Sequence, residues 1–229
     1  MAQQVKPARR VQLSRDRVLR TAVALADRGG LESLSMRTLA EELDVVPMAL
    51  YKHVANKDQL LDGMLDVVVG EIDPPVPGSD WKRAVRERIL SARRALLRHP
   101  WAAAVLESRK NPTPVVMAYM DSMIGIFRAG GFSVNLTHHV MHTIGSRLLG
   151  FTQELFNDSR TVDPEVLAVM LRELGPKFPN VLAIATAASH EGESIVGEGC
   201  DDQFEFEFAL DLLLDGFERL RQKNMSASQ

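Results

Sequence analysis

The chain has 229 residues, of which 45% are apolar, and a formal net charge of −3. This length supports one large hydrophobic core, or a small domain joined to a larger one, and the acidic balance excludes a uniformly basic nucleic-acid coat. The charge is uneven, because residues 1–60 carry 10 Lys and Arg against 7 Asp and Glu, whereas residues 61–229 carry 17 against 23. A basic start on an acidic body suggests that one end meets a polyanion, the alternative being a solvated basic tail.

The chain has one cysteine, Cys200, so no disulfide can form within it. Its acidic surroundings, VGEGCDD, disfavour a reactive thiolate. No apolar run reaches membrane-spanning length, and the N-terminus lacks the apolar core of a signal peptide. We therefore expect a cytoplasmic protein that does not associate with membranes.

The first part of the chain predicts three helices followed by a longer one. Ser14, Ser35 and Asn56 stand where N-caps are expected. Asp44 follows the second helix at a turn, and aspartate tolerates turn geometry better than most residues. Pro47 begins a very short third helix, in which the missing N–H of proline costs no hydrogen bond.

Residues 35–54 have the spacing of a helix-turn-helix, with two short helices joined by a turn of about three residues. Its small core would use Leu39, Ala40, Leu43, Val45, Leu50 and Val54. The second helix would expose Pro47, Met48 and Lys52, so that its N-terminal part can enter a DNA major groove. The side chains suited to phosphate oxygens are Tyr51, His53 and Lys57. Each residue alone could have an ordinary core or surface role, but together they favour DNA binding.

The stretch DPPVPGSD, residues 73–80, interrupts the helical pattern. Beyond it, helices are expected at 81–98, 114–129, 133–156, 164–174 and 203–222. A short segment at 101–108 separates the first two, and residues 175–202 are expected to lie partly in loops. The last helix has two apolar stripes, one containing Phe204, Phe208 and Leu212 and the other containing Phe206, Leu210, Leu213, Phe217 and Leu220. Such a helix can pack on its own core and also on a second copy of the chain, although a central helix of a monomer would look similar.

The segment RTLAEELDVVPMALYKHVANKDQLLDGM resembles the DNA-binding domain of the tetracycline-repressor (TetR) family of transcriptional regulators, from about Leu13 to Ile72. The C-terminal part resembles the tetracycline repressor subgroup more loosely, through WKRAVRERILSARRALLRHP and FEFALDLLLDGFERL. The resemblance implies base contacts from Arg37, Pro47, Met48 and Lys52, phosphate contacts from Ser35, Thr38, Tyr51, His53 and Lys57, and Ala49 within the same DNA-binding set. Lys52 stands where the family often has an aromatic residue, and Asp44 stands where it usually has glycine.

The resulting prediction is an all-α protein with a helix-turn-helix domain at 1–55, a connecting helix and Pro-rich linker at 56–79, and a ligand-binding and dimerisation domain at 80–229. The expected ligand-binding residues are Arg88, Leu106, Met117, Met120, Met123, Ile124, Phe127, His138, Met141 and His142. Methionines suit a pocket for irregular ligands, although all of these could be plain core residues. Leu106 stands where the tetracycline repressor has a histidine that holds drug-bound magnesium, which argues against that chelate as effector.

No metal site and no cofactor are predicted. His138 and His142 have the i, i+4 spacing of metal ligands, but ordinary helix histidines are favoured. Two copies should pair through the helices at 133–156 and 203–222, and a small molecule should release operator DNA by shifting the helix that begins at Asn56. The function expected is therefore a homodimeric, ligand-responsive repressor. The alternatives are an activator or dual regulator of the same fold and, less favoured, an all-α enzyme, for which no catalytic motif is found.

Overall fold

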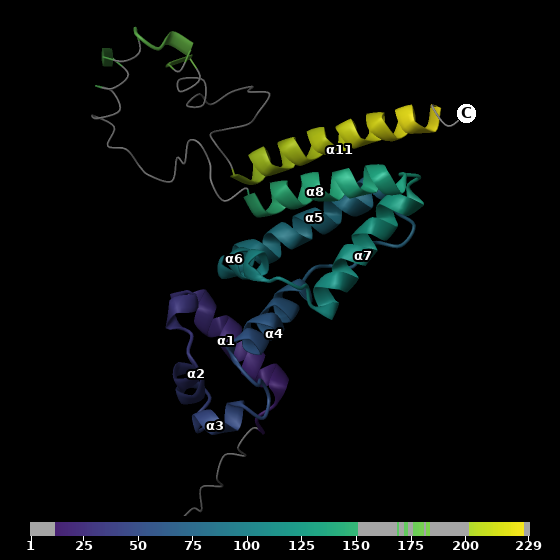
Figure 1. Cartoon of the computed structure of the whole chain (residues 1–229). Helices are drawn as coiled ribbons and strands as arrows, with labels where there is room; N and C mark the ends of the chain where they lie inside the picture. Colours follow the sequence, from purple (N-terminus) through teal and green to yellow (C-terminus); the bar gives the residue numbers. More distant parts are fainter. Residues whose placement is uncertain are drawn as a thin grey trace, which may run out of the picture. The chain divides into compact units, whose positions relative to one another are not determined.

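Figure 1 shows the computed structural model, which describes residues 12–150, residues 202–226 and scattered positions between 169 and 183. The described residues form helices and no strand, so the predicted all-α fold is confirmed. Two compact units are found, Met1–Gly130 and Gly131–Gln229. The predictions made for residues 151–168 and for Cys200 lie outside the described residues.

The first unit holds the predicted helix-turn-helix and the helices that follow it. In chain order its elements are α1 (Arg15–Gly29), a 3-10 turn (Leu31–Ser33), α2 (Met36–Glu42), α3 (Pro47–Leu50), α4 (Lys57–Val69), α5 (Trp81–Arg98), α6 (Trp101–Ser108) and α7 (Pro114–Ala129). The predicted helices at 81–98 and 114–129 are thus found where the sequence pattern places them, and the short segment at 101–108 is also a helix.

Local hydrogen bonds explain where α1 and α4 begin. The Ser14 hydroxyl accepts from the backbone N–H of Arg17, and the Asn56 side chain accepts from that of Gln59. The side chain of Gln59 in turn accepts from Ala55 rather than from the cap residue itself, at 2.9 Å. This reciprocal pair satisfies N–H groups that have no partner within the helix, so both predicted caps are confirmed.

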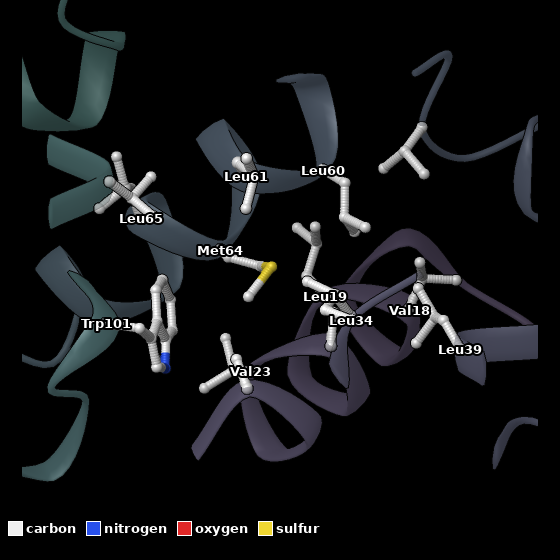
Figure 2. Packing of buried hydrophobic residues seen from close by; sticks show 14 of the residues in the cluster. Val18, Leu19, Val23, Leu34, Leu39, Leu60, Leu61, Met64, Leu65 and Trp101 are labelled. Atoms are coloured by element: carbon white, nitrogen blue, oxygen red, sulfur yellow. The ribbon is translucent and has the colours of Figure 1, made fainter. Parts of the chain in front are cut away.

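The core of the first unit forms where α1 and α4 cross (Figure 2). Met64 of α4 is fully buried, and its side chain points toward Leu19 and Val23 of α1, with Trp101 beside it. Gly63 allows the close crossing, because a Cβ at this position would lie 2.6 Å from a methyl group of Leu19. The same cluster includes residues of α2, α3 and α6, so the helix-turn-helix does not have a core separate from α4 and α6.

A polar cluster at the edge of this core was missed by the sequence analysis, which assigned no role to His99. His99 is buried, with Nδ1 2.8 Å from Asp27 Oδ1 and Nε2 3.2 Å from Glu71 Oε1. The indole N–H of Trp101 donates to the same oxygen of Asp27 at 2.7 Å. Arg98 donates a hydrogen bond of 2.6 Å to Glu71. Burial alone would raise the pKa of Glu71, but the hydrogen bonds from Arg98 and His99 outweigh this effect and lower it. The cluster joins α1, the end of α4 and the α5–α6 junction.

The second unit contains α8 (Val134–Gly150) and α11 (Asp202–Ser226), which lie side by side (Figure 1). Arg147 of α8 donates to the backbone oxygen of Glu205 and lies over the Phe206 ring at 5.4 Å. The buried stripe of α11 consists of Phe206, Leu210, Leu214 and Phe217. In the predicted stripe that contains Phe206, Leu214 is buried where Leu213 was expected, and Leu220 is exposed. Phe208 and Leu212 of the other predicted stripe are exposed. Among the described residues, no helix is long and apolar enough to cross a membrane.

Candidate DNA interface and effector core

The first helix of the predicted helix-turn-helix begins with a capping box. The Ser35 hydroxyl accepts from the N–H of Thr38 at 3.1 Å, and the Thr38 hydroxyl accepts from the N–H of Ser35 at 2.9 Å. The Thr38 hydroxyl also donates toward the backbone oxygen of Ser33 at 3.0 Å. Both hydroxyls therefore hold the start of α2 in place, and any contact with phosphate would be additional to this role.

The turn after α2 depends on Asp44, whose φ is 53°. This left-handed conformation is unfavourable for most residues other than glycine, and aspartate tolerates it comparatively well. The N–H of Val45 returns to the oxygen of Ala40 at 3.0 Å, which closes the end of α2. Leu39 and Ala40 are buried, as predicted, so α2 packs on the core while the chain turns toward α3.

The recognition element, residues 45–54, contains a very short helix, as predicted, but this helix ends before Lys52, which was expected on its exposed face. The α-helix covers only Pro47–Leu50, and Tyr51 to His53 form a turn stabilised by a bond from the N–H of His53 to the oxygen of Leu50. Leu50 and Val54 are buried. Lys52 and His53 thus lie beyond the helix proper.

One face of this element is apolar and exposed. Met48 is 73% exposed, Val46 is 68% exposed and Tyr51 is 46% exposed. An apolar surface of this kind is unusual unless it meets a partner. Val46 was not among the predicted site residues, because a valine in a helix-turn-helix pattern is normally assigned to the core.

The predicted charged contacts surround this face. Lys52 and Lys57 are exposed, and Arg37 projects from α2, where it pairs with Glu41 at 3.2 Å. An exposed ion pair of this type is weak, so Arg37 can exchange its partner at little cost. His53 and Ala49 are half-buried. The predicted DNA-binding residues therefore come from α2 and its N-cap, from α3 and the turn after it, and from the first turn of α4.

The predicted effector residues of the first unit differ in exposure. Met123 and Phe127 of α7 are fully buried, and the Phe127 ring lies 5.8 Å from that of Trp81 on α5. Met117, Met120 and Ile124 are exposed on the same helix. Leu106 of α6 packs against the core shared by α1 and α4.

Arg88 is the one charged residue of the predicted effector set, and it is only 8% exposed. Its guanidinium carbon lies 4.7 Å from the centre of the Tyr119 ring on α7. Burial raises the pKa of Tyr119 to about 12, an effect that the nearby charge of Arg88 partly opposes. Tyr119 was missed by the sequence analysis, because only the pairing of α5 with α7 brings it to Arg88.

The remaining predicted effector residues belong to the second unit. His138 and His142 are exposed on α8 with ring centres 4.6 Å apart, and Met141 is half-buried. In the part of the chain that the structure describes, no group of three or more His, Cys, Asp or Glu side chains is arranged to hold a metal ion.

Comparisons with known proteins match both parts of the chain. Residues 18–64 match the family described as "Bacterial regulatory proteins, tetR family", and residues 74–221 match "Tetracyclin repressor-like, C-terminal domain". An "HTH-type transcriptional regulator" of Saccharopolyspora erythraea is 40% identical over 121 residues, which are 52% of this chain and 51% of the relative, so this match spans about half of each protein.

Two further similarities extend over most of the chain. The "HTH-type transcriptional repressor DrrR1" of Streptomyces coeruleorubidus is 31% identical over 91% of this chain and 78% of its own length. The crystal structure of ActR from Streptomyces coelicolor in complex with actinorhodin has a TM-score of 0.67 and 28% identity, and covers 92% of this chain and 99% of that one.

Proposed function

Because the chain belongs to the TetR family of bacterial regulatory proteins, we propose that it represses transcription as a homodimer and releases its operator when a small molecule enters the helical core. The family and the class of ligand-responsive, DNA-binding regulator that the sequence predicted are confirmed. The residues that bind DNA and effector, the dimer, the cytoplasmic location and the absence of catalysis and of a cofactor remain proposals.

The observation that carries the DNA-binding proposal is the exposed face of the α3 element. Val46, Pro47 and Met48 present apolar surface suited to thymine methyl groups, whereas Leu50 behind them is buried and holds the element rigid. Lys52 adds a charge at the far end of this face. We assign sequence preference to these residues.

Phosphate contacts would fix the position of this face in the groove. Tyr51 and Lys57 are exposed on either side of Asn56, which caps α4, and an N-terminus of this kind favours negative charge. Ser35 and Thr38 would act mainly by holding α2, and Arg37 would leave Glu41 for the DNA.

The DNA-binding assignment can be tested with the only two tyrosines of the chain. After selection of a bound sequence from random duplex DNA, Tyr51→Phe should weaken binding about three- to tenfold in fluorescence anisotropy, the cost of one hydrogen bond. Tyr119→Phe on α7 is the matched control and should bind DNA like the unmodified chain. Equal affinity of Tyr51→Phe and the unmodified chain would remove Tyr51 from the interface.

Dimerisation through α8 and α11 is supported by the exposed apolar side chains of α11. Leu212 is 58% exposed, and Leu97 on α5 is 59% exposed, so the two residues form a matched pair. Leu212→Asp should convert the dimer to monomer in sedimentation velocity, whereas Leu97→Asp should leave it unchanged. A dimer that survives Leu212→Asp would place the interface elsewhere.

The sign of regulation depends on where the operator lies, so an activator remains the second candidate. Expression of a reporter under the selected operator should rise when the protein is deleted if it is a repressor, and fall if it is an activator.

A further inference from the structure

Arg88 is a buried cation that is bound to no carboxylate of the residues that the structure describes. Its Nη1 donates to the backbone oxygen of Asp73 at 3.0 Å, and its Nε is buried without a hydrogen-bond partner among the described residues. The carboxylate of Asp73 is bound instead by the Ser91 hydroxyl at 2.7 Å and by Arg94 at 3.0 Å. Within the described parts of the chain, no acidic side chain therefore neutralises the positive charge inside the α5–α7 pair.

Tyr119 provides a second unpaired donor next to this charge. Its hydroxyl is buried and has no partner among the described residues, while its ring lies 4.7 Å from the Arg88 guanidinium. Because the pKa of Tyr119 is about 12, the hydroxyl keeps its proton at neutral pH and can donate it. Burial lowers the pKa of Arg88, but a guanidinium remains charged in proteins.

A buried cation is unfavourable unless an acceptor pairs with it, and a buried hydroxyl without a partner adds to this cost. One carbonyl and one aromatic ring compensate only in part. Arg88 and Tyr119 are neighbouring donors with unsatisfied hydrogen-bonding groups. An empty binding site for an anionic group should have this arrangement.

The surroundings of the pair indicate the rest of the ligand. The α5–α7 contact continues from Arg88 and Tyr119 through buried Met123 to the Trp81–Phe127 ring pair. This stretch is apolar and partly aromatic, so it suits a flat hydrophobic body.

We propose that the effector of this regulator is an apolar, aromatic molecule with one anionic oxygen group, and that Arg88 and the Tyr119 hydroxyl bind that group. This inference rests on the proposed function, since it names the ligand class of the effector core. The anionic group replaces the missing partner of Arg88, and the effector thereby stabilises the contact between α5 and α7.

The test is titration calorimetry of the full chain with benzoate, 2-naphthoate and 9-anthracenecarboxylate, each compared with its neutral carboxamide. At least one acid should bind about tenfold more tightly than its amide, because charge-assisted hydrogen bonds are roughly twice as strong as neutral ones. Arg88→Gln should abolish this preference, and Tyr119→Phe should weaken binding of the acid about three- to tenfold without changing that of the amide. Circular dichroism should establish that each variant is folded.

Arg94→Gln is the matched control, because Arg94 also contacts Asp73 but is exposed. If Arg88 only anchored Asp73, the two glutamine variants would behave alike. Acids that bind no better than their amides, including acids that do not bind at all, overturn the inference, as does a preference that survives Arg88→Gln. Should Arg88→Gln fail to fold, Arg88→Lys and Tyr119→Phe carry the test, and an acid preference unchanged in both overturns it.

Operator binding without ligand is measured in parallel by anisotropy. Normal operator binding with no acid preference refutes only the anion site. Failure of the unmodified chain to bind any selected DNA would instead refute the proposed function, whatever the calorimetry shows.

Discussion

Asp27→Ala should lower the free energy of unfolding by about 2–4 kcal/mol, because each buried donor left without its acceptor costs about 1–3 kcal/mol. Asp27 Oδ1 is the acceptor for two such donors, Nδ1 of His99 at 2.8 Å and the indole N–H of Trp101 at 2.7 Å. A carboxylate oxygen can only accept, so both rings must donate to it. The Asp27 side chain is 28% exposed, which lets water replace part of the loss and places the expected value below the sum of two full penalties.

The assay is urea denaturation followed by circular dichroism, at fixed protein concentration so that dimerisation contributes equally. Asp16→Ala on the same helix is the control, because its pair with Arg20 is exposed and worth less than about 1 kcal/mol. Trp101→Phe removes one donor and keeps most of the ring, so its cost should be smaller, and the double variant should cost less than the sum of the two single changes. If Asp27→Ala changes stability by no more than Asp16→Ala does, the cluster does not stabilise the junction of α1 with α5 and α6.

Three further outcomes are expected. Lys57→Ala should weaken operator binding about equally for all DNA sequences, and it should reduce the salt dependence of binding by about one phosphate contact. Lys223→Ala on α11 is the control and should change neither quantity. An unchanged salt dependence in Lys57→Ala would show that Lys57 does not contact phosphate. Asp44→Gly should stabilise the fold by about 0.5–1 kcal/mol in thermal melts, because glycine adopts the φ of 53° without the left-handed penalty, and a loss of stability would contradict this explanation. Glu71→Gln should remove an acid-sensitive contribution to the free energy of unfolding. The pKa of Glu71 in the folded protein lies below its ordinary value of 4.5. The unmodified protein should therefore be more stable than the variant above pH 4.5 and should lose this advantage as the pH falls through the folded pKa. Urea midpoints of both proteins from pH 7 to pH 3 should therefore converge, and a constant difference would refute the assignment.

The caps and the helix order could be predicted because they depend on neighbours three or four residues apart. Ser14, Ser35 and Asn56 all accept from the N–H three positions later, as their sequence context indicates. The turn at Asp44 could also be foreseen from its place between two helices, and its left-handed conformation from the glycine that the family usually has there.

Long-range polar contacts could not be predicted in this way. His99 and Asp27 are 72 residues apart, and nothing local marks either as a partner of the other. The same applies to Arg88 and Tyr119, since an arginine in a helix pattern is normally exposed. The prediction placed Lys52 on the third helix, whereas the backbone ends this helix at Leu50.

The two ends of the recognition element have a practical consequence. On one side, the turn at Asp44 ends α2. On the other side, the hydrogen bonds between Ala55, Asn56 and Gln59 fix the start of α4. Between these fixed ends, only Leu50 and Val54 are buried. Residues 45–54 thus form a segment whose exposed side chains can be redesigned for a new operator. Such a redesign would keep the turn at Asp44, the start of α4, and the buried Leu50 and Val54.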